Sequence, residues 1–87
     1  MLYRLYTQNT KLAVIKSILN RYCEAYTILP GTGVYRGVEE LCLVIEIGGV
    51  DKQAVEAAAQ EIATDLKQQC VIVTGVAEIF ARTFSGA

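Results

Sequence analysis

The sequence contains no histidine, which excludes histidine-based acid–base catalysis, Ser-His triads and histidine-ligated metals. Its three cysteines, Cys23, Cys42 and Cys70, form no C-x-x-C pair, so neither a zinc ribbon nor a redox motif is present. Because each cysteine has apolar neighbours, we expect buried free thiols, which fit a reducing compartment. The sequence therefore predicts a cytoplasmic protein without a metal or a cofactor.

Long apolar runs and a surplus of basic charge are also missing. The longest apolar run, Leu41–Ile45, is far shorter than the ~20 residues of a membrane helix. Arg4 and the polar run Thr7–Lys11 interrupt any early apolar region of the kind found in a signal peptide. The formal net charge is −1, whereas a nucleic-acid-binding domain carries a basic surplus. These absences argue against a membrane protein and against nucleic acid as a partner.

What is present is an apolar chain of 87 residues, 53% of them hydrophobic, which we expect to form a single domain over residues 1–87. Alternation of apolar and polar residues predicts strands, bounded by glycine, proline and polar residues. The expected strands are Leu2–Thr7, Ala25–Leu29, Leu41–Ile47, Cys70–Thr74 and, after Gly75, the alternating segment Val76–Phe84.

Two helices are expected between these strands, because apolar residues there recur at spacings of three and four. Asn9 or Thr10 is the expected cap of the first helix, and Asp51 that of the second. The apolar stripes comprise Leu12, Ile15, Leu19 and Tyr22 in the first helix and Val55, Ala59, Ile62 and Leu66 in the second. The order β-α-β-β-α-β indicates an α+β fold, the ferredoxin-like plait, with a short extra C-terminal strand.

Two helices cover only one face of such a sheet, so the other face needs another explanation. We expect alternate residues of the first and third strands to point away from the helices, and Arg4 to pair with Glu46 across the sheet. A domain of this size buries only ~60–65% of its unfolded surface. The open face, or the edge offered by Val76–Phe84, is therefore predicted to associate with other copies of the chain.

The segment Pro30–Gly37 contains the candidate ligand-binding residues. Its glycines permit close backbone approach and can form an anion-binding nest, Arg36 can pair with phosphate or carboxylate, and Tyr35 can stack. The alternative is a plain hairpin with glycines at turn positions. The predicted binding residues are Gly31, Thr32, Gly33, Tyr35, Arg36 and Gly37, and no catalytic residue is predicted.

The run from Tyr26 to Gly37, followed by the strand Leu43–Ile47, a capped helix and Val71–Thr74, resembles the PII-like signalling superfamily. Members of that superfamily are plaits that form trimers and bind nucleotides or other small anions between subunits. The resemblance implies that Gly31, Thr32 and Gly33 match the glycine motif after the second strand. The long loop of PII proteins is missing, and Gln68-Gln69-Cys70 stands where a basic, glycine-rich segment is expected.

Two functions follow from these observations. The first is a non-enzymatic, PII-like regulatory homo-oligomer, expected to be a trimer, that binds a small anion or nucleotide. The alternative is a phage- or plasmid-encoded interaction protein that inhibits a bacterial defence complex, because the sequence is also similar to short phage and plasmid proteins. An enzyme is not predicted, since the residues supply no specific pair of nucleophile and base.

Overall fold

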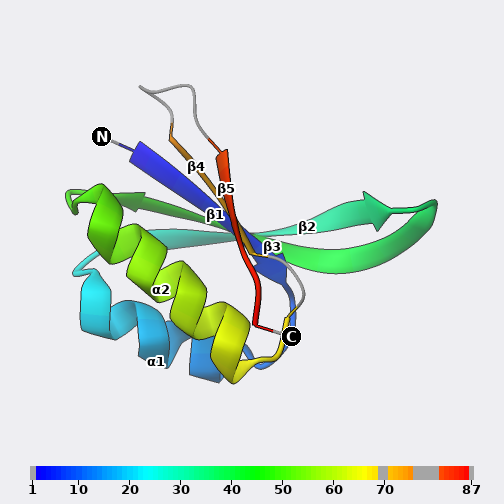
Figure 1. Cartoon of the computed structure of the whole chain (residues 1–87), viewed down its shortest axis with the longest axis horizontal. Coiled ribbons are helices and arrows are strands. Elements are labelled where there is room, and N and C mark those ends of the chain that lie inside the picture. The colour runs from blue at the N-terminus through cyan, green and yellow to red at the C-terminus, as the bar shows by residue number, and fades with distance from the viewer. Residues whose placement is uncertain (1, 69–70, 76–80, 87) are drawn as a thin grey trace.

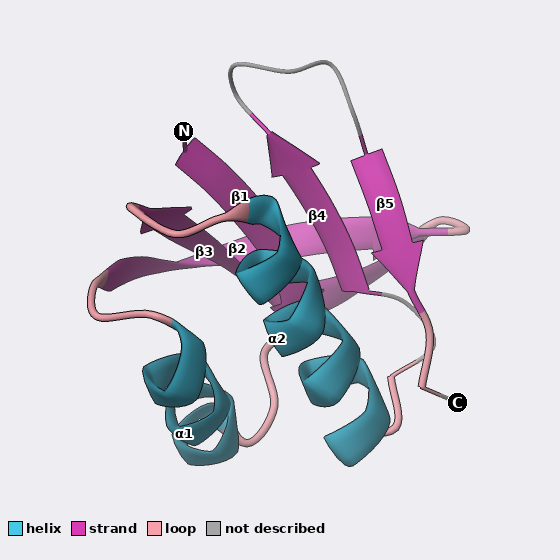
Figure 2. Ribbon diagram, turned by 60° about the vertical axis from the view of Figure 1, so that its left-hand side comes forward, coloured by secondary structure: helices cyan, strands magenta, loops and turns pink. Residues whose placement is uncertain are grey.

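The computed structural model describes residues 2–68, 71–75 and 81–86, which form one antiparallel sheet and two helices (Figure 1). Along the chain the elements are β1 (Leu2–Gln8), α1 (Leu12–Tyr22), β2 (Tyr26–Tyr35), β3 (Val38–Gly48), α2 (Lys52–Asp65), β4 (Val71–Gly75) and β5 (Ala81–Phe84). The strand order is β2-β3-β1-β4-β5, and both helices cover the same face (Figure 2). This arrangement confirms the ferredoxin-like plait with an extra C-terminal strand.

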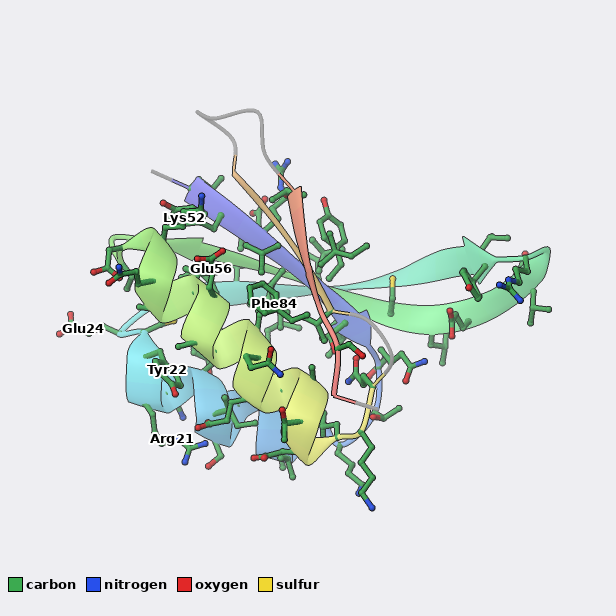
Figure 3. All side chains as sticks on the ribbon, in the orientation of Figure 1. Arg21, Tyr22, Glu24, Lys52, Glu56 and Phe84 are labelled. Carbon is green, nitrogen blue, oxygen red and sulfur yellow. The ribbon has the colours of Figure 1, made fainter. Side chains whose placement is uncertain are left out.

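The core lies between this covered face and the two helices. Burial alternates along β1 and along the second half of β3, as the period of a strand requires. The buried apolar residues of the sheet are Tyr3, Leu5, Leu43, Ile45, Ile47, Val71 and Val73. The helices add Ile15, Ile18, Leu19, Val55, Ala58, Ala59, Ile62 and Ala63. Phe84 of β5 is partly buried against this core (Figure 3).

The two helices begin differently. Asp51 caps α2 as predicted, its side chain accepting a hydrogen bond from the backbone N–H of Ala54 at 2.9 Å. The predicted cap of α1 by Asn9 or Thr10 is wrong, because the chain enters that helix at Lys11, which has a left-handed φ of 49° and no side-chain cap bond. The backbone N–H groups of Asn9 and Thr10 bond instead to the carbonyls of Leu41 and Gln8, so both residues belong to the turn that precedes the helix.

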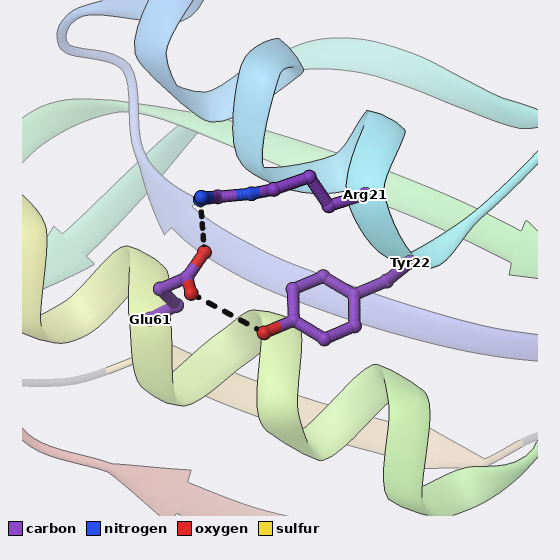
Figure 4. Close-up of polar contacts among 3 residues, drawn as sticks. All are labelled: Arg21, Tyr22 and Glu61. Atoms are coloured by element: carbon purple, nitrogen blue, oxygen red, sulfur yellow. Dashed lines mark hydrogen bonds and ion pairs between the residues drawn. The ribbon is translucent and has the colours of Figure 1, made fainter.

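The helices are joined to each other by a polar cluster around Glu61 (Figure 4). The carboxylate of Glu61 accepts hydrogen bonds from the guanidinium of Arg21 and the hydroxyl of Tyr22. Burial, with a further contribution from the nearby negative charge of Glu61, raises the pKa of Tyr22 above its ordinary value. The cluster therefore ties the end of α1 to the middle of α2.

The second strand is longer than predicted. It was expected to end at Leu29, but β2 continues through Pro30 and both following glycines to Tyr35, paired with β3 throughout. The reason is its place at the edge of the sheet, where one side of the backbone has no partner strand and a proline without an N–H is tolerated. The expected loop is therefore reduced to a tight turn at Arg36-Gly37.

The C-terminal region is described in two pieces, β4 and β5, which pair antiparallel. The extra strand is confirmed over Ala81–Phe84, whereas the first part of the predicted strand, residues 76–80, and Cys70 lie outside the described residues. After β5 the chain returns to the segment that follows α2, where the N–H of Gly86 bonds to the carbonyl of Gln68 at 2.9 Å. Among the described helices, none has the length and apolarity needed to cross a bilayer.

Candidate functional site: a hollow on the open sheet face

The face of the sheet opposite the helices carries the side chains that alternate with the core. On β1 and β3 these include Arg4, Tyr6, Cys42, Val44 and Glu46, all of them half-buried. The predicted pair is confirmed, since the guanidinium of Arg4 bonds to the Glu46 carboxylate at 2.9 Å and this bond raises the pKa of Arg4. The open face is therefore an organised mixture of apolar and charged groups.

The hairpin of β2 and β3 extends well beyond the rest of the sheet (Figure 1). Its turn places Arg36 and Gly37 at positive φ values of 52° and 80°, the geometry of a two-residue hairpin turn. The guanidinium of Arg36 lies over the ring of Tyr35, 5.2 Å from its centroid. Large apolar side chains are strongly exposed along the hairpin, namely Leu29, Val34, Tyr35, Val38 and Leu41.

A hollow of about 560 Å³ lies where this hairpin meets the centre of the sheet. Its volume is within the ~300–1,000 Å³ of small-molecule sites. The lining combines two tyrosines, a carboxylate, a carboxamide, a thiol and several aliphatic side chains. Its residues are Tyr6, Thr7, Gln8, Gly33, Val34, Tyr35, Glu40, Leu41, Cys42 and Ile72.

The glycines of β2 keep the side of the hollow above Cys42 open. A Cβ atom built on Gly31 would lie 3.4 Å from the sulfur of Cys42, and one on Gly33 would lie 4.0 Å from it. Cys42 is a free thiol that is only half-buried, whereas Cys23 is buried as predicted. Larger residues at these two positions would cover the thiol and fill this part of the hollow.

One polar contact joins two lining residues from neighbouring strands. The side-chain amide of Gln8 donates to the Glu40 carboxylate, with 3.3 Å between nitrogen and oxygen. Gln8 is the last residue of β1 and pairs with Cys42, while Glu40 pairs with Gly33 on the hairpin. The pair therefore connects the centre of the sheet to the base of the projecting hairpin.

The six predicted binding residues separate into three groups. Gly33 and Tyr35 line the hollow, and Gly31 lies beside Cys42. Thr32 alternates with the glycines and so points to the other side of the hairpin. Arg36 and Gly37 form the turn. Gly31 and Gly33 lack positive φ and belong to a regular ladder, so the expected anion nest is not formed by them.

Sequence reasoning missed most of the polar lining. Alternate residues of the first and third strands were expected on the open face, but Gln8 and Ile72 were not connected with Glu40. The signal for this connection lies in strand register, since Tyr6 pairs with Ile72 and Gln8 with Cys42. Register between strands so distant in the chain is set by tertiary packing, which is why the sequence did not reveal the hollow.

Two helices on a sheet of this order define an α+β plait, and the comparisons with known proteins agree with that class. No protein-family model and no curated protein matches the sequence. Among solved structures, a phage SAM lyase in its apo state is similar, with a TM-score of 0.76 and 24% sequence identity. The match covers 97% of this chain and 87% of the other. At this identity the likeness concerns the fold.

This likeness corrects two predictions. The chain was expected to be a non-enzymatic, PII-like regulator, but a solved protein with a similar fold, the phage SAM lyase, is an enzyme. The expectation rested on the order of elements, which the lyase shares, and on Gly31-Thr32-Gly33, which lies in a strand rather than in a ligand-binding loop. The link to phage proteins is supported, whereas inhibition of a defence complex, the cytoplasmic location and the trimer stay predictions.

Proposed function

We propose that this chain is a lyase that binds SAM (S-adenosylmethionine) in the hollow on the open sheet face and cleaves it. Two observations support the proposal. The fold resembles that of a phage SAM lyase over 97% of the chain. The hollow also presents aromatic, carboxylate and aliphatic groups together, which suits a ligand with a flat base, an ammonium group and a sulfonium.

The lining residues have distinct roles in this proposal. The ring of Tyr6 offers a flat face on which a base can stack and to which a cation is attracted, while the ring of Tyr35 already has the Arg36 guanidinium over one face. Glu40 supplies a carboxylate for the ammonium group of the ligand, and Gln8 orients that carboxylate. This reading replaces the predicted anion site with a site for a cationic ligand, and it retains Gly33 and Tyr35 from the predicted residues.

The chemistry follows from the charge on sulfur. When a lyase breaks a C–S bond of SAM, the bonding electron pair remains on sulfur and the sulfonium becomes a neutral thioether. The carbon fragment then either passes a proton to solvent and forms a double bond or closes a ring on one of its own nucleophiles, and no water is consumed. Because positive charge is lost from sulfur, an apolar surrounding favours this step over the charged ground state, and the side chains of Ile72 and Tyr6 supply apolar groups on the open face.

The proposal is tested by incubating the purified protein with SAM and following both cleavage products by mass spectrometry. We expect cleavage by the wild type and a loss of roughly tenfold or more in kcat/KM for Glu40→Gln, because a charge-assisted contact is removed. Glu39→Gln is the matched control, since Glu39 is the neighbouring carboxylate and does not line the hollow. Absence of cleavage and of SAM binding in the wild type would reject the proposal.

We also propose that copies of the chain associate through the outer hairpin, whereas the sequence predicted association through the open face or through the edge of Val76–Phe84. The support is the exposure of Val34, Val38 and Leu41, each of which is 66–67% exposed. Apolar patches of this kind mark interfaces between proteins. Sedimentation of the wild type is expected to give a multiple of 9.5 kDa, three for the predicted trimer, and Val38→Lys is expected to give monomers. A wild-type monomer at high concentration would oppose this.

A further inference from the structure

The buried residue Gln68 lies behind the hollow, just after α2, and it is 3% exposed. Its side-chain oxygen accepts two hydrogen bonds, from the hydroxyl of Thr7 at 2.6 Å and from the backbone N–H of Gln8 at 3.2 Å. Its side-chain nitrogen is buried without a partner among the described residues. Burying an unpaired N–H costs free energy of folding. The hydrogen bonds made by the side-chain oxygen and by the backbone of Gln68 must therefore hold the side chain in this position.

The backbone of Gln68 is held on both sides. Its N–H bonds to the carbonyl of Ala63 at 3.0 Å, and its carbonyl accepts from Gly86 at 2.9 Å. The side chain therefore projects from a fixed point between the end of α2 and the C-terminal segment. It reaches the end of β1, where the described pairing of β1 with β4 stops at Tyr6. The Gln68 carboxamide thus accepts a hydrogen bond from the backbone of Gln8, in the way that a backbone carbonyl of a neighbouring strand would.

We infer that Gln68 is a positioning residue for the hollow, acting through Gln8 on the carboxylate of Glu40. The contacts form a continuous series, because Gln68 holds the backbone of Gln8 and the Gln8 side chain donates to Glu40. The inference rests on the proposed function, in which Glu40 holds the ammonium group of SAM. It assigns part of that site to a buried residue that does not touch the ligand.

The sharpest test compares Gln68→Met with Gln68→Glu. Methionine has a similar length but no acceptor, whereas glutamate keeps an acceptor oxygen for both donors and exchanges the unpaired N–H for an unpaired oxygen. We expect Gln68→Met to weaken SAM binding roughly three- to tenfold in calorimetry, the range for one lost hydrogen bond, and Gln68→Glu to restore most of it. Gln53→Met, on the exposed surface of α2, is the control for the same change elsewhere.

A double-variant cycle separates positioning from a general loss of structure. If Gln68 acts through Gln8, then Gln8→Met weakens binding by a similar factor and the double variant is no weaker than either single variant. The inference would be overturned if the losses of SAM affinity in the two single variants multiplied in the double variant, or if Gln68→Met bound SAM as tightly as the wild type. Should Gln68→Met fail to fold, Gln68→Glu with near-wild-type affinity supports it and a tenfold loss opposes it.

A measurement without SAM keeps the two proposals distinguishable. Hydrogen exchange at the backbone amide of Gln8, followed by nuclear magnetic resonance, reports directly on its bond to Gln68. We expect exchange there to rise at least tenfold in Gln68→Met, with Leu5 in the middle of β1 unchanged. If this occurs but the wild type does not bind SAM, the positioning contact is retained and the proposed function fails. Unchanged exchange at Gln8 would reject the contact itself.

Discussion

The two faces of the sheet differ in burial and in the kind of side chain they carry, although the same strands form both. On β1, Leu5 is completely buried beneath the helices, while the next residue, Tyr6, points to the open face and lines the hollow. On β3, Ile45 is completely buried, while Val44 and Glu46 on either side are half-buried on the open face. Adjacent residues of one strand therefore serve different purposes.

This difference indicates how a chain of 87 residues can have both a stable core and a binding surface. The covered face buries aliphatic side chains against both helices, and burial of apolar surface is the main source of stability. The open face does not form part of this core, so it can expose tyrosines, a carboxylate and a thiol around a hollow. Changes on the two faces should therefore have separable effects on stability and on binding.

The largest effect is expected from truncating the covered face. Ile45→Ala should lower the free energy of unfolding by about 2–5 kcal/mol, because it leaves a cavity in a packed core. Val44→Ala, one residue away on the open face, should cost less than about 1 kcal/mol, since its side chain is only half-buried. Urea denaturation measures both. An equal loss in the two variants would mean that the open face is also covered in solution.

The next effect compares Gly86, which packs against α2, with Gly31 in the edge strand β2. A Cβ on Gly86 would lie 2.0 Å from the carbonyl oxygen of Ala63, so Gly86→Ala must displace the C-terminal segment from α2 and should cost about 1–3 kcal/mol. Gly31→Ala meets only the flexible thiol of Cys42 at 3.4 Å and should change stability by less than about 1 kcal/mol. Thermal unfolding distinguishes them, and equal destabilisation would contradict the described packing.

A smaller effect is expected at the start of α2. Asp51→Ala removes the cap bond to Ala54 and should cost about 1 kcal/mol. Asp65→Ala, at the last residue of α2, is the control, because a negative charge at that end is unfavourable to the helix dipole. Chemical denaturation should show a loss for the first and none for the second. SAM affinity should remain unchanged in both.

The smallest effect concerns pH and the cluster between the helices. The pKa of Tyr22 is raised above 10.0 in the folded protein, so the folded state retains its proton more tightly than the unfolded chain. Its contribution to stability is therefore complete below about pH 10 and is lost as the pH rises through the folded value. Tyr22→Phe should weaken the alkaline fall in melting temperature. An identical pH profile in the variant would contradict this.

The hairpin shows where sequence reasoning fails. Pro30, Gly31 and Gly33 are residues of turns in most contexts, so the sequence predicted a loop, yet they continue an edge strand to Tyr35. Local preference was overruled by pairing with β3 along ten residues. Of the predicted binding residues only Gly33 and Tyr35 line the hollow, because most of the other lining residues come from β1, β3 and β4.

The sequence by itself determined the order of elements, the covered face of β1 and β3, the cap at Asp51 and the pair of Arg4 with Glu46. The first three depend on alternation, helical period and capping chemistry, which are local, whereas the pairing of Arg4 with Glu46, 42 positions apart, was predicted from their opposite charges on strands expected to lie in one sheet. Only the tertiary structure decided the length of the hairpin and the hollow that joins Tyr6, Glu40 and Ile72. The physical reason is that strand register over long separations follows from the packing of the whole core, and no local pattern encodes it.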